Sequence, residues 1–246
     1  MENAGQNTPS REFENALMYL PRKAPTSYRK RQVVFDENHP PGAIHLILKG
    51  RVKVTCRLHD GTETVVDICS AGDFLGESSL LGRTAFSGRA VALDNASLVS
   101  WTIPEIEEQC ERQPKLGIAL LHLFAQRGQD SQARLQSFAL DKTPERLVRS
   151  LLRFGDRMGT RTGDGCIDIP PLTHQVIADY VGTTREMINL QMSQLRHQGS
   201  LSYSRKGIQI RVRALRDHLR LPGRQRDGLP SAAPDPSDIA GPAALT

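Results

Sequence analysis

The sequence predicts an α+β fold with three parts in order: a compact barrel or sandwich of short strands, a long helix, and a C-terminal winged helix-turn-helix. Three patterns predict it. Residues 30–103 alternate apolar with polar side chains, the period of two that is typical of strands. Residues 115–138 repeat apolar or small side chains at spacings of four and three. Residues 173–198 have the pattern of two short helices joined by a tight turn. The length of 246 residues favours two domains.

The first part is predicted from its alternation and its glycines. The apolar positions of two expected strands are Ile44, Leu46, Leu48, Val52, Val54, Cys56 and Leu58. Asp60 and Gly61 predict a hairpin turn into a returning strand over 63–69. Glycines interrupt the region at short intervals, as expected for short strands in a barrel or sandwich. These glycines are Gly50, Gly61, Gly72, Gly76, Gly82 and Gly88.

The long helix follows a short helix that Pro104 begins and Pro114 ends. Its heptad seam favours a parallel homodimer, in which small residues at mid-length let two helices approach closely. The alternative is a helix that packs one apolar side on its own β domain. The seam residues are Leu121, Phe124, Gly128, Ser131, Leu135 and Phe138. Residues 139–142 are the expected connector and hinge, after which Thr143 caps a new helix with Pro144 at its first position.

The two short helices indicate a DNA-binding helix-turn-helix. Ala178 is small where the helices must cross, and Gly182 lies where the chain turns sharply. The apolar stripes of the two helices are Ile177, Val181, Ile188, Met192 and Leu195. The opposite face of the second helix carries Arg185, Glu186, Asn189 and Leu190. Such a helix is suited to the major groove of DNA. The alternative is an ordinary helical hairpin whose second helix shows polar groups to water.

Charge favours the DNA interpretation. Residues 142–220 hold 14 Lys and Arg against 7 Asp and Glu, a net charge of +7. Residues 1–141 and 221–246 each have a net charge of −1, so the excess of +5 lies wholly in the helix-turn-helix segment, as phosphate neutralisation requires. Residues 200–213 predict two short strands around a basic turn at Arg205 and Lys206. This wing would lie along the phosphates beside the groove.

Bulk properties are those of an ordinary soluble protein, with 38% apolar and 24% charged residues. No apolar run approaches a membrane span, and the first residues have no signal-peptide character, so we expect a cytoplasmic protein without membrane partners. The cysteines are too scattered for a metal site or a disulfide framework. They are Cys56, Cys69, Cys110 and Cys166. Residues 221–246 are rich in Pro, Ala, Gly, Asp and Ser and are expected to be a disordered tail.

This order of parts resembles the cyclic-AMP receptor/fumarate–nitrate regulator superfamily of bacterial transcription factors. The resemblance covers roughly residues 20–215 and depends on three segments: PGAIHLILKGRVKV over 41–54, AGDFLGESSLLG over 71–82 and VGTTRE over 181–186. It implies a cyclic-nucleotide-binding-like β-roll and RNA polymerase as a partner. It also implies an effector that changes the relative placement of two helix-turn-helix units in a dimer. The implied division is an arm over 1–20, the β-roll effector domain over 21–114, the dimerisation helix over 115–139 and the DNA-binding domain over 140–220.

The effector residues follow from the same resemblance. Cyclic-nucleotide members bind the ligand's phosphate and ribose with a Gly-Glu pair and an Arg-Ser pair. Here the first pair matches, but Phe86 replaces the arginine of the second, which removes a charge-assisted bidentate contact. We therefore expect weak or no response to cyclic AMP. The alternative is a cyclic-nucleotide response with a non-standard phosphate contact, from Arg83 or Arg89. The candidate effector residues are Gly76, Glu77, Ser87, Arg89 and Ser131, the last on the helix where family members contact a purine.

The effector itself is not identified by the sequence. The N-terminal cysteine cluster of the iron–sulfur members is missing, no metal site is predicted, and no pattern supports a redox role for Cys69 or Cys110. Some members of the family ligate haem with histidine, and His39, His45, His59 and His122 are candidates only by residue type. A β-roll without any effector, in a protein regulated by its abundance, is the remaining alternative.

On the DNA side, Arg185 and Glu186 match family residues that contact bases. Arginine can bind O6 and N7 of guanine, and glutamate can accept from the N4 amine of cytosine. Thr183 and Glu186 also have the spacing of a capping box. Leu190 replaces a family arginine and can contact a thymine methyl, so we expect an altered half-site. The expected phosphate contacts are Thr184, Arg205 and Lys206.

Two other classes of protein compete with a DNA-binding regulator. An enzyme is not expected, because no Ser/His/Asp order, phosphate loop, metal-ligand spacing or carboxylate pair is present. A cyclic-nucleotide-regulated signalling subunit that does not bind DNA would share the β-roll. The basic C-terminal winged helix argues against both classes.

Overall fold

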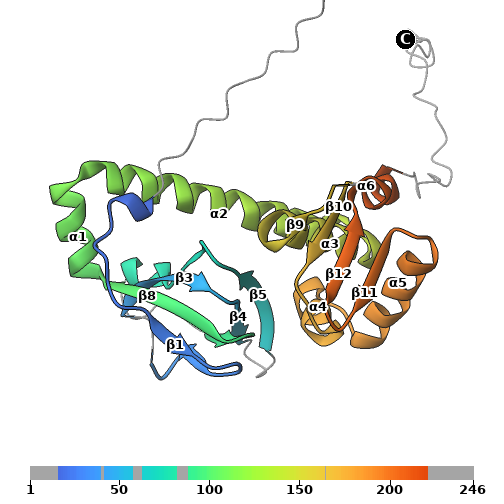
Figure 1. The fold of residues 1–246 in the computed structure, drawn as a ribbon, viewed down its shortest axis with the longest axis horizontal. Helices are drawn as coiled ribbons and strands as arrows, with labels where there is room; N and C mark the ends of the chain where they lie inside the picture. The colour runs from blue at the N-terminus through green and yellow to red at the C-terminus, as the bar shows by residue number, and fades with distance from the viewer. Residues whose placement is uncertain (1–15, 40–41, 58–62, 82–87, 164, 221–246) are drawn as a thin grey trace, which may run out of the picture.

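The structure is a computed structural model that describes residues 16–39, 42–57, 63–81, 88–163 and 165–220. A β-roll lies at one end, the long helix α2 runs above it, and a helix-rich part lies at the other end (Figure 1). The expectations for Leu58, His59, the Asp60–Gly61 turn, residues 82–87 and the 221–246 tail fall outside the described residues. Within the described residues, no helix is long and apolar enough to cross a membrane.

The β-roll consists of two four-stranded antiparallel sheets, with strand orders β1-β8-β3-β6 and β2-β7-β4-β5. Its strands are β1 (Thr26–Tyr28), β2 (Val33–Phe35), β3 (Ala43–Lys49), β4 (Val52–Arg57), β5 (Glu63–Cys69), β6 (Phe74–Leu75), β7 (Gly88–Ala92) and β8 (Ala96–Thr102). A short 3₁₀ helix, Ala16–Met18, precedes them, and another, Glu77–Leu81, follows β6. Two apolar clusters fill the roll, one of which α1 and α2 complete.

The predicted strict alternation of buried and exposed side chains is wrong in β3 and β4, and the pairing of each strand with a neighbour is irregular. The register of β3 shifts between Ile47 and Lys49, so Ile47 is buried and Leu48 is 47% exposed. Between β4 and β5 the pairing shifts at Val54 and Thr55, where Val66 of β5 is the extra residue, and Thr55 is buried in place of its apolar neighbours. The extra residue Leu48 reverses the side-chain order beyond it in β3, which a period of two cannot anticipate.

The helix boundaries differ from the expected ones by one or two residues. Helix α1 spans Ile103–Arg112, and α2 spans Pro114–Leu140, so the connector is only residues 141–142. Helix α3 spans Thr143–Met158 and has Lys142 as its N-cap, so Thr143 is the first helical residue and does not cap the helix. Towards its own chain, α2 buries Leu116, Ala119 and Leu120.

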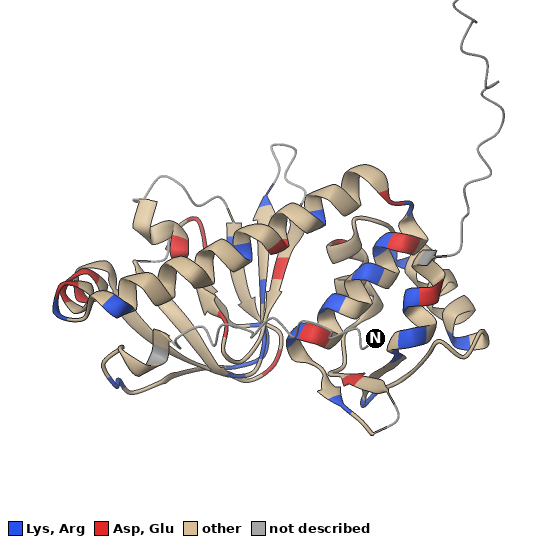
Figure 2. Ribbon diagram, turned by 90° about the horizontal axis from the view of Figure 1, so that it is seen from above, with Lys and Arg blue, Asp and Glu red and all other residues tan. Residues whose placement is uncertain are grey.

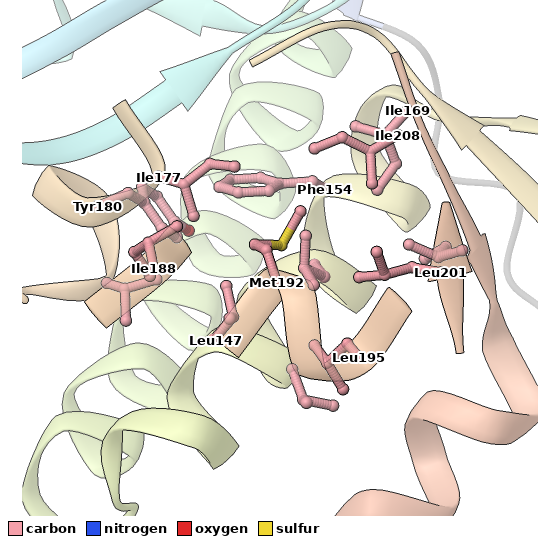
Figure 3. Packing of buried hydrophobic residues seen from close by; sticks show 14 of the residues in the cluster. Leu147, Phe154, Ile169, Ile177, Tyr180, Ile188, Met192, Leu195, Leu201 and Ile208 are labelled. Carbon is pink, nitrogen blue, oxygen red and sulfur yellow. The ribbon is translucent and has the colours of Figure 1, made fainter. Parts of the chain in front are cut away.

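Within the described residues, the C-terminal part combines four helices with a four-stranded sheet of order β11-β12-β10-β9. After α3 its elements are β9 (Thr160–Arg161), β10 (Cys166–Ile169), α4 (His174–Val181), α5 (Arg185–His197), β11 (Leu201–Ser204), β12 (Gly207–Arg211) and α6 (Val212–Arg220). Phe154, Ile177 and Met192 lie at the centre of its core (Figure 3). The same cluster includes Val65 and Ile68 of β5. The winged domain is therefore docked on the roll through a shared apolar core.

Candidate DNA-binding surface and effector cavity

Helices α4 and α5 form the predicted helix-turn-helix. Ile177, Ala178 and Ile188 are fully buried where the helices cross. Gly182 ends α4 in the left-handed conformation, with φ 72°, which glycine adopts without strain. A Cβ at Gly182 would also lie 2.7 Å from the Phe138 ring of α2. Both the turn and the contact with α2 therefore require glycine there.

The start of α5 differs from the expected capping box. Thr184 is the N-cap, and its hydroxyl accepts a hydrogen bond from the Met187 N–H at 3.2 Å. The predicted pair of Thr183 and Glu186 is therefore wrong by one residue, and Glu186 lies exposed in the first turn. The Thr184 hydroxyl keeps its own proton, which can be donated to a phosphate oxygen.

The face of α5 that is predicted to contact bases, called the reader face below, is exposed. Arg185, Glu186, Asn189 and Leu190 all reach solvent, and Leu190 is 52% exposed. Within the described part of the chain, no ion pair or hydrogen bond occupies the side chain of Arg185 or Glu186. Both groups are therefore available to base edges.

The wing is a hairpin of β11 and β12 with Arg205 and Lys206 exposed at its turn. The Lys206 N–H donates to Ser204 Oγ at 3.1 Å, which tightens the turn. Tyr203 of β11 lies against two side chains of the helices: its ring is 5.1 Å from the Arg196 guanidinium and 5.3 Å from the His174 ring. Figure 2 shows Lys and Arg positions on several elements of this part of the molecule.

A cavity of about 910 Å³ lies between the β-roll, α2 and the winged domain. It brings together three predicted effector residues, Gly76, Glu77 and Ser131. Arg89 is exposed and lines a separate hollow with acidic residues, so the structure does not bring it to Glu77. Ser87 lies outside the described residues.

The sequence reasoning missed Arg127 of α2, which occupies the predicted phosphate and ribose side of the cavity. Its guanidinium lies 3.3 Å from the Glu77 carboxylate and donates to the Phe74 carbonyl at 2.6 Å. The Ser131 hydroxyl donates to the Arg127 carbonyl at 2.9 Å, within its own helix. Burial raises the pKa of the neighbouring Cys69 thiol, so this cysteine is protonated. An arginine one helical turn before Ser131 is the signal that was available in the sequence.

Arg157 of α3 joins the winged domain to the roll. Its guanidinium lies 2.6 Å from Asp67 and 2.9 Å from Asp73. Burial alone would raise the pKa of Asp67, but Arg157 and Arg127 more than offset this and hold it below its ordinary value. Burial likewise opposes the charge of Arg157, and the two aspartates raise its pKa. The Asp67 and Arg157 side chains are therefore both charged at neutral pH in this junction between the winged domain and the roll.

Arg134 of α2 makes a second connection across the junction. It donates to the carbonyls of Val65 at 2.6 Å and Tyr180 at 2.8 Å, and also to that of Val66. Its guanidinium stacks over the Tyr180 ring, 3.9 Å from the centroid. One side chain of the long helix thus holds β5 and α4 together.

Three of the four histidines that were candidate haem ligands by residue type lie within the described residues: His39, His45 and His122. His45 Nδ1 lies 2.6 Å from the Ser100 hydroxyl, and burial lowers the pKa of His45 to about 4. His39 pairs with Asp36 at 3.4 Å, whereas His122 is exposed on α2. Among the described residues, no group of three or more His, Cys, Asp or Glu residues is placed to hold a metal ion.

Comparison with known proteins assigns both parts of the chain. Residues 25–113 match the cyclic nucleotide-binding domain family, and residues 145–217 match the Crp-like helix-turn-helix domain family. Among curated proteins, the CRP-like cAMP-activated global transcriptional regulator of Mycobacterium tuberculosis is 29% identical over 196 residues, which covers 76% of this chain and 83% of that protein. The global nitrogen regulator of Nostoc sp. is 25% identical over 186 residues, which covers 75% and 83%.

The fold is similar to that of solved regulators. FixK2 from Bradyrhizobium japonicum aligns with a TM-score of 0.69 and 22% identity, over 80% of this chain and 97% of that one. The c-di-GMP responsive regulator CLP of Xanthomonas campestris aligns with a TM-score of 0.60 and 20% identity, over 76% and 92%. With both family matches in the order of the superfamily, the chain belongs to the cyclic-AMP receptor/fumarate–nitrate regulators and is a DNA-binding transcriptional regulator.

Proposed function

We propose that the protein is a cytoplasmic homodimer that reads a two-fold symmetric DNA site and acts on RNA polymerase. The observation that supports this is the exposed face of α5, where the side chains of Arg185 and Glu186 have no ion-pair or hydrogen-bond partner among the described residues. The basic turn of the wing adds further positive charge in the same domain. Residues 140–220 bind DNA, residues 115–139 hold the dimer, and residues 21–114 receive the effector. Thr184, Arg205 and Lys206 contact phosphates, while Arg185, Glu186, Asn189 and Leu190 face the bases.

The exposed stripe of α2 supports the dimer. Leu121 is 66% exposed and Leu135 is 69% exposed, on a side of the helix other than the one that buries Leu116 and Leu120. Large apolar side chains in a row at heptad spacing favour a second helix as their partner. Phe124, Gly128 and Ser131 of the same seam border the cavity, so the partner helix would also form one of its walls.

Replacing Leu121 with glutamate tests the dimer. Sedimentation should show monomers, and binding to a palindromic duplex should be lost with them, because two half-sites no longer bind together. Gln132→Glu, at an exposed position of the same helix outside the seam, is the matched control and should leave a DNA-binding dimer. Leu121→Glu monomers that keep full affinity for the palindrome would contradict the proposal.

The β-roll responds weakly or not at all to cyclic AMP. Phe86 stands where the family has the phosphate-binding arginine, Arg89 lines another hollow, and Arg127 already engages Glu77. Calorimetry should therefore detect no micromolar binding of cyclic AMP by the wild type. Phe86→Arg should gain binding, since it restores the cation for the cyclic phosphate. Micromolar binding by the wild type would contradict this expectation.

A cyclic-nucleotide response with a different phosphate contact is the second candidate. The observation that favours it is the Arg127 guanidinium, a cation that lines the cavity beside Glu77. If the wild type binds a cyclic nucleotide, Arg127→Met should abolish that binding, because it keeps the stem and removes the charge. Retained binding by Arg127→Met would exclude this contact.

A further inference from the structure

His174 connects the two helices of the helix-turn-helix to the wing. It is the first residue of α4, and its Nδ1 lies 2.5 Å from Oδ1 of Asn189 on the reader face of α5. Its ring makes a T-shaped contact with the ring of Tyr203 of β11, with the centroids 5.3 Å apart. Asn189 is exposed and His174 is half-buried, and their contact reaches the surface that is available to DNA.

The chemistry of this contact determines how the Asn189 amide points. A carbonyl oxygen only accepts, so the proton of the hydrogen bond lies on Nδ1 and His174 is the donor. Oδ1 of Asn189 is therefore turned toward α4, and the amide NH₂ group points away from the imidazole. The Tyr203 ring also contacts the imidazole, which limits the rotation of His174.

The direction of an amide decides which base it selects. An asparagine that recognises adenine donates to N7 and accepts from the N6 amine, so it needs both ends of the amide. An amide whose oxygen is turned toward the protein presents its NH₂ donors to the DNA. Guanine offers two acceptors in the major groove, O6 and N7, whereas adenine offers the single acceptor N7 beside its own N6 donor.

We propose that His174 is a positioning residue that directs the N–H donors of Asn189 toward DNA, so that Asn189 selects guanine over adenine at one base pair. This inference rests on the proposed role of α5 as the base-reading helix. The imidazole does not need to touch a base, because its effect passes through the amide.

The test measures base preference at each position of the half-site for a set of full-length variants. His174→Phe keeps a ring against Tyr203 and removes the N–H, whereas His174→Asn restores an N–H near the place of Nδ1. Asn189→Ala removes the amide. His197→Phe changes an exposed histidine at the end of α5 and is the matched control. Thermal melting of each variant checks that the domain is folded.

The wild type should prefer guanine over adenine at one base pair by on the order of tenfold. Asn189→Ala and His174→Phe should both lose this preference at that base pair, His174→Phe by gaining affinity for adenine. His174→Asn should keep it, and His197→Phe should match the wild type. An equal loss of affinity for all sequences by His174→Phe would make His174 a phosphate contact and overturn the proposal.

Two further outcomes separate this inference from the proposed function. If Asn189→Ala changes preference at no base pair, Asn189 is not a reader and the inference fails. The role of α5 in contacting bases is tested independently by Arg185→Ala. If this variant loses specificity while Asn189→Ala does not, the proposed function holds and only the inference about Asn189 fails. If Arg185→Ala also leaves every base preference unchanged, α5 is not the reading helix and the proposed function itself fails.

Discussion

The winged domain has two arginine-bearing surfaces that differ in what their arginines contact. On the side facing the roll and α2, Arg153 and Arg157 bind aspartates and are only 21% and 18% exposed. On the side available to DNA, Arg185 and Arg205 are exposed, and within the described residues neither side chain has an ion-pair or hydrogen-bond partner. Some of the positive charge of residues 142–220 is therefore paired with aspartates inside the protein. The net charge of +7 is larger than the charge available to bind DNA phosphates.

Solvation explains the difference between the two surfaces. A guanidinium removed from water must recover its hydration from carboxylates or carbonyls, so Arg157 contacts both Asp67 and Asp73. An exposed guanidinium keeps its water and can exchange it for a phosphate or a guanine edge. The same residue type thus stabilises the domain junction on one side and is free for a ligand on the other.

The largest expected effect comes from breaking the junction. Arg157→Ala leaves two mostly buried aspartates without this cation and should cost about 2–4 kcal/mol of unfolding free energy at pH 7. Because the pKa of Asp67 is lowered in the folded state, this stabilisation is complete above the ordinary value of 3.8 and is lost as the pH falls below it. The difference between wild type and variant should therefore shrink in acid. Denaturant titrations at several pH values measure both.

Arg149 supplies the matched control for the junction. It lies on the same helix and pairs with Asp141 at 2.7 Å, but its side chain is 53% exposed. Arg149→Ala should cost only about 0.5 kcal/mol, because the Arg149 guanidinium is mostly in solvent and the Asp141 carboxylate, itself 15% exposed, keeps a hydrogen bond from the Ser137 hydroxyl. Equal costs for the two variants would mean that burial does not distinguish these ion pairs.

On the DNA side, Arg185→Ala should cost about 1–3 kcal/mol of binding free energy on the specific site and relax preference at one guanine. Folding stability should stay unchanged, in contrast to Arg157→Ala. Affinities for the specific site and for a scrambled duplex measure this, with the exposed Arg216→Ala on α6 as the control. A loss of the same factor on both duplexes would make Arg185 a phosphate contact.

The smallest effect is expected at the wing. Lys206→Ala should weaken binding to all duplexes about equally and reduce the slope of log affinity against log salt by about one. A salt series on the specific and scrambled duplexes separates this loss of charge from the loss of base reading at Arg185. A change in sequence preference would show that Lys206 contacts a base.

The sequence anticipated elements whose signal is local. Gly182 between two apolar stripes predicted the helix-turn-helix, and the Arg205–Lys206 turn predicted the wing, because periodicity and turn chemistry act over a few residues. Boundaries were less accurate: Thr184 caps α5 where Thr183 was expected, since adjacent threonines offer equivalent caps. The register shifts at Ile47 of β3 and between β4 and β5 also escaped prediction, because they arise from pairing with other strands.

The sequence by itself determined the α+β class, the order of the parts and the exposed residues of α5, because each follows from short-range pattern. Only the tertiary structure decided which charges remain free. Asp67 and Arg157 are 90 residues apart in the chain, yet they form one ion pair when α4 docks on β5. An ion pair between residues that are far apart in the chain produces no periodic pattern in the sequence. The fold therefore decided that Arg157 stabilises the domain junction while Arg185 faces solvent.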